Sequence, residues 1–176
     1  PQTPTELNKI YRISRGDNQY NSADWANWGN VVPYGAPFVD VNSNGIYEPA
    51  IDTPGYSNVS QILFMALTDG FVDKHSPGEG FGGGTLPLFA DVRITAWCYT
   101  DSALSDVQFI KYDIINKSNS VWDSTIFSLV GDADLGDAND DYVGMDSLRN
   151  MWYIYNGDNY DPVYGANPPA VGMRML

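Results

Sequence analysis

The stretch Leu88–Thr100, LFADVRITAWCYT, decides the fold class because it is long and rich in β-branched and aromatic residues. Such side chains favour extended strands, since they pack well on a pleated surface. A second stretch, Val107–Asn116 (VQFIKYDIIN), has the two-residue repeat of a strand and places Phe109 on one face and Ile110 on the other. The two stretches predict neighbouring strands of a β-sheet.

Further strands are expected on both sides of this pair. Leu7–Ser14 (LNKIYRIS) alternates and is expected at a sheet edge, and Met151–Tyr155 (MWYIY) is expected as a later strand. Val121–Val130 (VWDSTIFSLV) follows a polar turn and is expected to form a hairpin with Val107–Asn116. Ser60–Thr68 (SQILFMALT) is the best short helix candidate, with a buried strand as the alternative.

The composition favours strands joined by elaborate loops. The chain has 17 glycines, 11 prolines and an aromatic content of 14%. Nineteen of its 22 acidic residues are aspartate, which is a poor helix former and favours turns. At 176 residues we expect one domain over residues 1–176, as a piece of a larger chain. The expected fold is an all-β, jelly-roll-like β-sandwich with long Asp- and Gly-rich loops and little helix.

The charge and the reactive residues exclude several classes of function. The net charge of −13 argues against nucleic acid and anionic membranes as partners, and no stretch is apolar enough to insert into a bilayer. Cys98, the only cysteine, is expected to be a small buried residue, and His75 is the only histidine. Glycoside hydrolysis needs a carboxyl in an apolar pocket, and none is evident. We therefore expect a protein that is not an enzyme.

The segment Asp40–Asp52 (DVNSNGIYEPAID) resembles the start of an EF-hand calcium loop. Oxygen ligands recur at alternate positions, and glycine at the sixth position permits a sharp turn. The candidate calcium ligands are Asp40, Asn42, Asn44, the backbone carbonyl of Ile46, and Asp52.

The end of this segment departs from the EF-hand pattern. Position 12 is Ile51, the closing acid Asp52 stands at position 13, and Pro49 opposes a regular exiting helix. We therefore expect an ion-binding loop without EF-hand helices. The alternative is an Asx-rich turn closed by hydrogen bonds alone.

A second acidic segment, Asp132–Asp146 (DADLGDANDDYVGMD), holds six aspartates and no lysine or arginine. Folding such a run crowds like charges, and a divalent cation would relieve that repulsion. The candidate ligands are Asp132, Asp134, Asp137, Asn139 and Asp141, with Asp140 as a further possibility. The alternative is a solvated acidic loop. Whether the two segments form one site or two stays open.

Aromatic residues surround the first segment in the sequence. Trp25, Trp28 and Tyr34 are candidates for stacking on the apolar faces of sugar rings. The other interpretation is a small core that anchors long loops, since aromatic side chains bury large areas. We favour the second interpretation.

Several motifs occur in an order that resembles a module common in large secreted proteins of Bacteroidetes-type bacteria. The resemblance covers roughly residues 20–176 and is carried by Trp25, Trp28, Gly35–Asp40, Asn42–Pro49, Ile51–Asp52, Lys111–Ser118, Asp132–Asp146, Tyr155–Asn156, Asp161, Tyr164–Gly165 and Pro168–Gly172. Members often have cysteine at the position of Met145, so any disulfide there is absent from this chain.

The resemblance implies cargo of the type IX secretion route, exported to the cell surface or released where calcium is available. It implies no reaction. From this context and the two candidate calcium segments we expect a non-catalytic structural or adhesive module of an extracellular bacterial surface protein, with loops ordered by Ca²⁺. Copies of the chain, other surface proteins and polysaccharide are the partners left open. The alternative is a carbohydrate-binding module of a secreted hydrolase, and a third interpretation is the catalytic domain of such a hydrolase.

Overall fold

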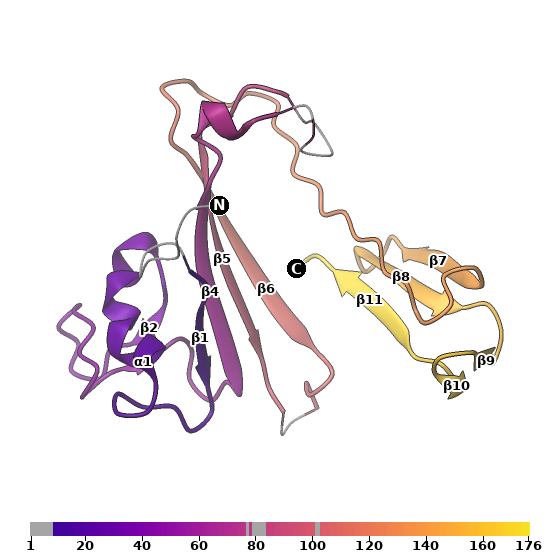
Figure 1. The fold of residues 1–176 in the computed structure, drawn as a ribbon, viewed down its shortest axis with the longest axis horizontal. Helices are drawn as coiled ribbons and strands as arrows, with labels where there is room; N and C mark the ends of the chain where they lie inside the picture. Colours follow the sequence, from indigo (N-terminus) through magenta and orange to yellow (C-terminus); the bar gives the residue numbers. More distant parts are fainter. Residues whose placement is uncertain (1–8, 77, 79–83, 101–102) are drawn as a thin grey trace. The chain divides into compact units, whose positions relative to one another are not determined.

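The computed structural model describes residues 9–76, 78, 84–100 and 103–176. The chain forms two compact units, Pro1–Asp123 (unit 1) and Ser124–Leu176 (unit 2), which are described separately. Antiparallel strands dominate both units (Figure 1). The expected all-β class is therefore confirmed, and the jelly-roll arrangement stays a prediction.

Unit 1 is built on a four-stranded antiparallel sheet with the order β1-β4-β5-β6. Its strands are β1 (Tyr11–Ser14), β4 (Gln61–Thr68), β5 (Ala90–Cys98) and β6 (Gln108–Asn116). Both strands expected within residues 88–100 and 107–116 form and pair with each other. Residues 61–68 form the strand that was the alternative to a helix, so the helix candidate is wrong.

The remaining elements of unit 1 are short. They are α1 (Ala23–Asn27), the 3₁₀ helices η1 (Trp28–Asn30), η2 (Val32–Tyr34) and η3 (Val72–Lys74), and the strands β2 (Phe38–Val39) and β3 (Thr53–Pro54). β2 pairs with β3, so the ends of the first candidate calcium loop are held together.

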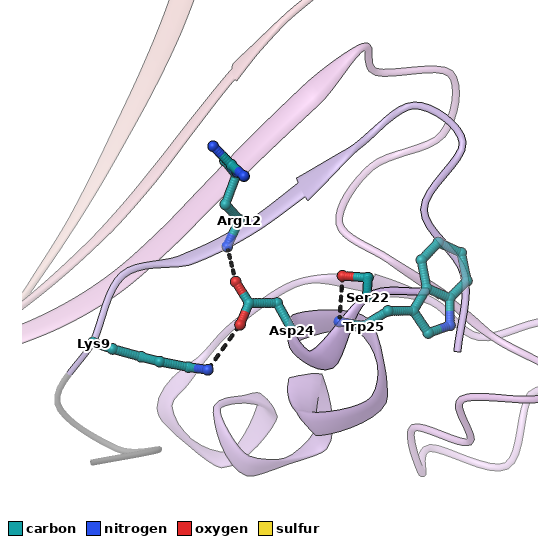
Figure 2. A network of polar contacts seen from close by, with 5 residues as sticks. All are labelled: Lys9, Arg12, Ser22, Asp24 and Trp25. Atoms are coloured by element: carbon teal, nitrogen blue, oxygen red, sulfur yellow. Dashed lines mark hydrogen bonds and ion pairs between the residues drawn. The ribbon is translucent and has the colours of Figure 1, made fainter. Parts of the chain in front are cut away.

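Helix α1 is fixed to β1 by one aspartate (Figure 2). The carboxylate of Asp24 accepts hydrogen bonds from Lys9 Nζ and from the backbone N–H of Arg12, both at 2.8 Å. The N-cap Ser22 accepts a hydrogen bond from Trp25 N at 3.3 Å through its hydroxyl oxygen. These contacts define a five-residue helix, which is too short to be stable without tertiary contacts.

The core of unit 1 lies on one face of the sheet. Tyr11 stands opposite Phe64 and Ile13 opposite Ile62, and all four side chains are buried. Trp28 from η1 is fully buried and meets the Tyr11 ring edge-on, with centroids 6.0 Å apart. The irregular segment that carries α1 and η1 is therefore anchored by aromatic packing.

Unit 2 contains a three-stranded antiparallel sheet with the order β11-β8-β7, from β7 (Asp141–Asp146), β8 (Met151–Asn156) and β11 (Ala170–Arg174). A short pair, β9 (Tyr160–Asp161) and β10 (Gly165–Ala166), follows β8 in the chain. Ile154 and Leu135 are its buried apolar residues. The strand expected at residues 151–155 forms as β8.

Some expected features differ in the structure. Residues 121–130 form no strand, and the hairpin partner of β6 is β5, so the hairpin expected there is wrong. The polar turn does form, with Asn116 Nδ2 donating to Ser120 O at 2.7 Å, but Val121 beyond it is 90% exposed. Strand propensity depends on a partner surface, and this segment has none within the described chain.

Two smaller expectations can also be compared. The edge strand expected at Leu7–Ser14 forms over Tyr11–Ser14, while Leu7 and Asn8 lie outside the described residues. Cys98, expected to be buried, is partly exposed at the end of β5. The part of the chain that the structure describes has no helix with the length and apolar character needed to span a membrane.

Candidate calcium-binding loops

The first candidate loop, residues 40–52, joins β2 to β3 and is closed by Asp40. Asp40 Oδ1 accepts a hydrogen bond from Asn44 N at 3.2 Å, and Oδ2 accepts one from Gly45 N at 2.7 Å. Gly45 has a φ of 77°, in the left-handed region that glycine adopts without steric cost. The sharp turn predicted at the sixth position is therefore present.

Glu48 connects the two asparagines of this loop. Asn42 Nδ2 and Asn44 Nδ2 both donate to Glu48 Oε2 at 2.7 Å. The amide oxygens accept from backbone N–H groups, Asn42 Oδ1 from Asn44 at 3.2 Å and Asn44 Oδ1 from Ile46 at 2.7 Å. An amide oxygen has two lone pairs, so each retains one for a cation. The half-buried Asp40 and the exposed Asn42 and Asn44, at positions 1, 3 and 5, are thus connected within one loop.

Glu48 is not among the ligands predicted from the sequence. Counted from Asp40, it stands at position 9, where EF-hand loops carry a ligand that often acts through water. Position counting alone would therefore have identified it. Ile46 lies in the same exposed turn, with its side chain 64% exposed.

Asp52 differs from the other predicted ligands of this loop in being buried, with only 1% of its surface exposed. Its Oδ1 accepts from Val41 N at 3.0 Å, and its Oδ2 accepts from Glu48 N at 2.7 Å. Both oxygens thus hold the loop closed from inside. Burial, followed by the charge of Asp52, raises the pKa of the nearby Tyr47 phenol. That phenol donates to Trp25 O at 2.7 Å.

The second candidate run lies in unit 2, and its predicted ligands do not share one environment. Asp132 and Asp134 are exposed. Asp137 Oδ1 accepts from the backbone N–H and the side-chain amide of Asn139, at 3.1 and 2.5 Å. Asp141 Oδ2 accepts from Leu135 N at 2.8 Å and so closes a turn before β7.

Asp161 lies outside this run but accepts hydrogen bonds from it, and it is not among the ligands predicted from the sequence. It is fully buried, with Oδ2 accepting from Asp137 N at 2.9 Å and Oδ1 from Val163 N and Tyr164 N, both at 2.7 Å. The hydrogen bond from Asp137 N, with those from Tyr164 and Val163, lowers the pKa of Asp161. Its signal in the sequence is an aspartate before proline, which favours a turn.

Among the described residues, no group of three or more His, Cys, Asp or Glu side chains is arranged to hold a metal ion. The loop 40–52 combines carboxylates with amide and backbone oxygens, which are also normal calcium ligands. A calcium site here would therefore draw on a mixed set of oxygens.

The candidate sugar-stacking residues differ in exposure. Trp28 is fully buried and its Nε1 donates to Pro37 O at 2.8 Å. Trp25 is half-buried and its Nε1 donates to Pro49 O at 3.0 Å, inside the first candidate loop. Tyr34 is 47% exposed. The two tryptophans therefore pack and anchor the loop segments, as the small-core interpretation predicts.

Comparison of the chain with protein-family models, with curated proteins and with solved structures finds no match.

Proposed function

We propose that this chain is a non-catalytic structural or adhesive module of an extracellular bacterial surface protein, with calcium ordering its loops. The observation that carries the proposal is the loop 40–52. Glu48 connects Asn42 to Asn44, and Asp40 accepts from the backbone of the same turn. Asp52 and the β2–β3 pair hold the base of the loop. This arrangement supports a hard cation with oxygen ligands.

The mechanism is thermodynamic linkage. An ion that binds only the folded loop stabilises it by about 2.7 kcal/mol when its free concentration is about 100 times its dissociation constant. In a calcium-rich exterior, the loop becomes rigid and resists proteolysis. Trp25 donates to Pro49 within the loop and also packs against the core of unit 1. Ordering the loop should therefore also stabilise the core.

The sheet of unit 1 supports association with copies of the chain or with other surface proteins. Met65, Ile94 and Tyr112 lie opposite one another on β4, β5 and β6, on the face away from Phe64. Tyr112 is 44% exposed, and β6 is an edge strand in the sheet. An apolar face beside an open edge is typical of interaction surfaces.

The carbohydrate-binding alternative receives less support. It requires a coplanar, exposed aromatic platform, and the full burial of Trp28 removes the centre of the predicted one. Polysaccharide is therefore not the partner we propose for this module.

The test is calcium titration by calorimetry on the full chain and two variants. Glu48→Gln keeps an oxygen for the amide donors of Asn42 and Asn44 but removes the charge. We expect calcium affinity at the loop to fall at least tenfold. Asp106→Asn, an exposed residue in the same unit, makes the same charge change and should leave the affinity unchanged.

Equal calcium affinity in wild type and Glu48→Gln would contradict the assignment of the calcium site to the loop 40–52. Equal losses in Glu48→Gln and Asp106→Asn would show a diffuse charge effect, and would also contradict the proposal.

A further inference from the structure

Three buried side-chain oxygens in unit 2 accept no hydrogen bond from the part of the chain that the structure describes. They are Asp140 Oδ1, Asp141 Oδ1 and Asn156 Oδ1. A buried polar atom without a partner costs about 1–3 kcal/mol, and more if it is charged. All three atoms are oxygens, and two belong to carboxylates, so a cation is a partner that suits their chemistry and charge.

The strand register brings these residues to one end of the β7–β8 ladder. Asp141 is paired with Asn156 across the two antiparallel strands. Directly opposed side chains project from the same face of a sheet, with Cβ atoms about 4.5–5.5 Å apart. Gly157 N donates to the backbone oxygen of Asp140 at 2.6 Å, which fixes the backbone beside this pair. The face shared through the register is that of Asp141 and Asn156, because adjacent residues of a strand point to opposite faces.

Asn156 is 8% exposed, and its amide orientation is fixed. Nδ2 donates to Asp158 O at 3.2 Å and to Tyr160 O at 3.1 Å. Because two carbonyls hold the nitrogen toward the turn after β8, the amide oxygen faces the other way. Since the carbonyl oxygens of Asp158 and Tyr160 can bond only to the amide nitrogen of Asn156, the unpartnered atom is its oxygen, an acceptor.

Asp141 is also fixed before any ligand arrives. Its Oδ2 accepts from Leu135 N at 2.8 Å, and Leu135 is only 4% exposed. One carboxylate oxygen therefore closes the turn, while the other remains on the face it shares with Asn156. A ligand atom held by a buried neighbour needs little reorganisation on binding.

We propose that Asp141 and Asn156 form the centre of a second cation site in unit 2, next to Asp140, whose own buried oxygen also lacks a partner. Carboxylate and amide oxygens without His or Cys favour calcium over softer metals. The inference rests on the proposed function for the choice of ion, but it uses a different unit and different residues from the loop 40–52. Asp132 and Asp134, which the sequence suggested as ligands, are exposed and lie outside this set.

The experiment counts bound calcium on the full chain and measures thermal unfolding with calcium and with excess chelator. In Asp141→Asn, the new amide oxygen takes the hydrogen bond from Leu135 N, so the amide nitrogen faces Asn156 Oδ1. We expect the ion count to fall by one. With chelator, this variant should melt at or above the wild-type temperature, because the new donor supplies a partner that Asn156 lacks.

Asp132→Asn is the matched control, since it makes the same charge change at an exposed position of the same run. It should keep the wild-type ion count. A measurement on the wild type needs no variant: the backbone amide signals of Leu135 and Gly157 should shift when calcium is added, because their acceptors belong to Asp141 and Asp140.

The outcomes separate this inference from the proposed function. If Asp141→Asn keeps the full ion count while Glu48→Gln loses an ion, the site in unit 2 is overturned and the loop 40–52 stands. If Asp141→Asn loses an ion and Glu48→Gln does not, the inference stands and the loop assignment fails. A wild type that binds no calcium overturns both.

Discussion

Two aspartates, Asp52 and Asp161, are fully buried and accept backbone hydrogen bonds through both carboxylate oxygens. Each closes an irregular segment that has too few ladder bonds to hold its own shape. Buried carboxylates survive in folded proteins when such donors replace water. Part of the aspartate excess in this chain therefore stabilises loops without any ion.

Replacing Asp52 with alanine leaves the N–H groups of Val41 and Glu48 without their acceptor. At about 1–3 kcal/mol for each of the two donors, we expect a loss of about 2–6 kcal/mol in unfolding free energy. Urea unfolding at neutral pH measures it. Asp106→Ala, at an exposed position, should change stability by about 0.5 kcal/mol or less. A similar small change in Asp52→Ala would contradict this role.

Asp161 makes stability depend on acid pH. Its pKa is lowered in the folded state by the N–H groups of Asp137, Tyr164 and Val163, so the folded state binds protons less readily than the unfolded chain. The contribution is complete above the ordinary aspartate pKa of about 3.9 and is lost as the pH falls through the lower folded value. We expect Asp161→Asn to be less stable than wild type at neutral pH, with a gap that narrows below about pH 4.

Urea midpoints of wild type and Asp161→Asn, measured from neutral pH to below about pH 4, would follow this difference in stability. Asp132→Asn, at an exposed position, is the control for the change in charge alone. A constant difference between wild type and Asp161→Asn down to the most acid pH would contradict the titration argument.

At the scale of elements, the segment from α1 to η2 is held by aromatic packing more than by its own hydrogen bonds. Trp28 contacts Tyr11 and lies 6.2 Å from the Phe64 ring, so it joins η1 to β1 and β4. Short helices of three to five residues do not persist without such contacts.

Truncating Trp28 should therefore loosen the whole segment. We expect Trp28→Ala to lower the unfolding free energy by about 3–5 kcal/mol, as for other fully buried large side chains. Tyr34→Ala, at a residue that is 47% exposed, should have a much smaller effect. Chemical denaturation followed by tryptophan fluorescence compares the two. Equal losses would show that Trp28 is not the anchor of this segment.

The strands could be predicted from sequence wherever a partner strand supplied the expected packing. The alternation in residues 107–116 and the β-rich run in 88–100 agree with the paired strands β5 and β6. Residues 121–130 have a similar β-strand propensity but no partner strand in the described chain, so the strand predicted there does not form. The β-strand propensity of a residue describes how well its side chain packs in a sheet, so it predicts a strand only where partner strands are present.

The candidate sites show the same limit. The turn of the first loop could be predicted because its polar residues alternate within one short segment, and Gly45 adopts the expected backbone conformation. The roles of Asn156 and Asp161 could not be predicted from the sequence. That of Asn156 depends on the register of β7 and β8, and that of Asp161 on backbone donors distant in the sequence. Such relations appear only after folding.

At the scale of the whole molecule, a net charge of −13 is distributed over two units, each with a candidate calcium site. The repulsion among these acids opposes folding in the absence of counter-ions. Calcium bound at the loop 40–52 and at the Asp141–Asn156 site would reduce this repulsion in both units. We therefore expect the stability of both units to depend on calcium.

Thermal unfolding in calcium and in excess chelator, with a metal count on the same sample, tests this claim most directly. With the ion at about 100 times its dissociation constant, we expect a rise of roughly 5–10 °C in melting temperature for one site. One or two bound calcium ions should be found. An unchanged melting temperature with no bound metal would contradict the account, and would mean that hydrogen bonds alone hold these acidic loops.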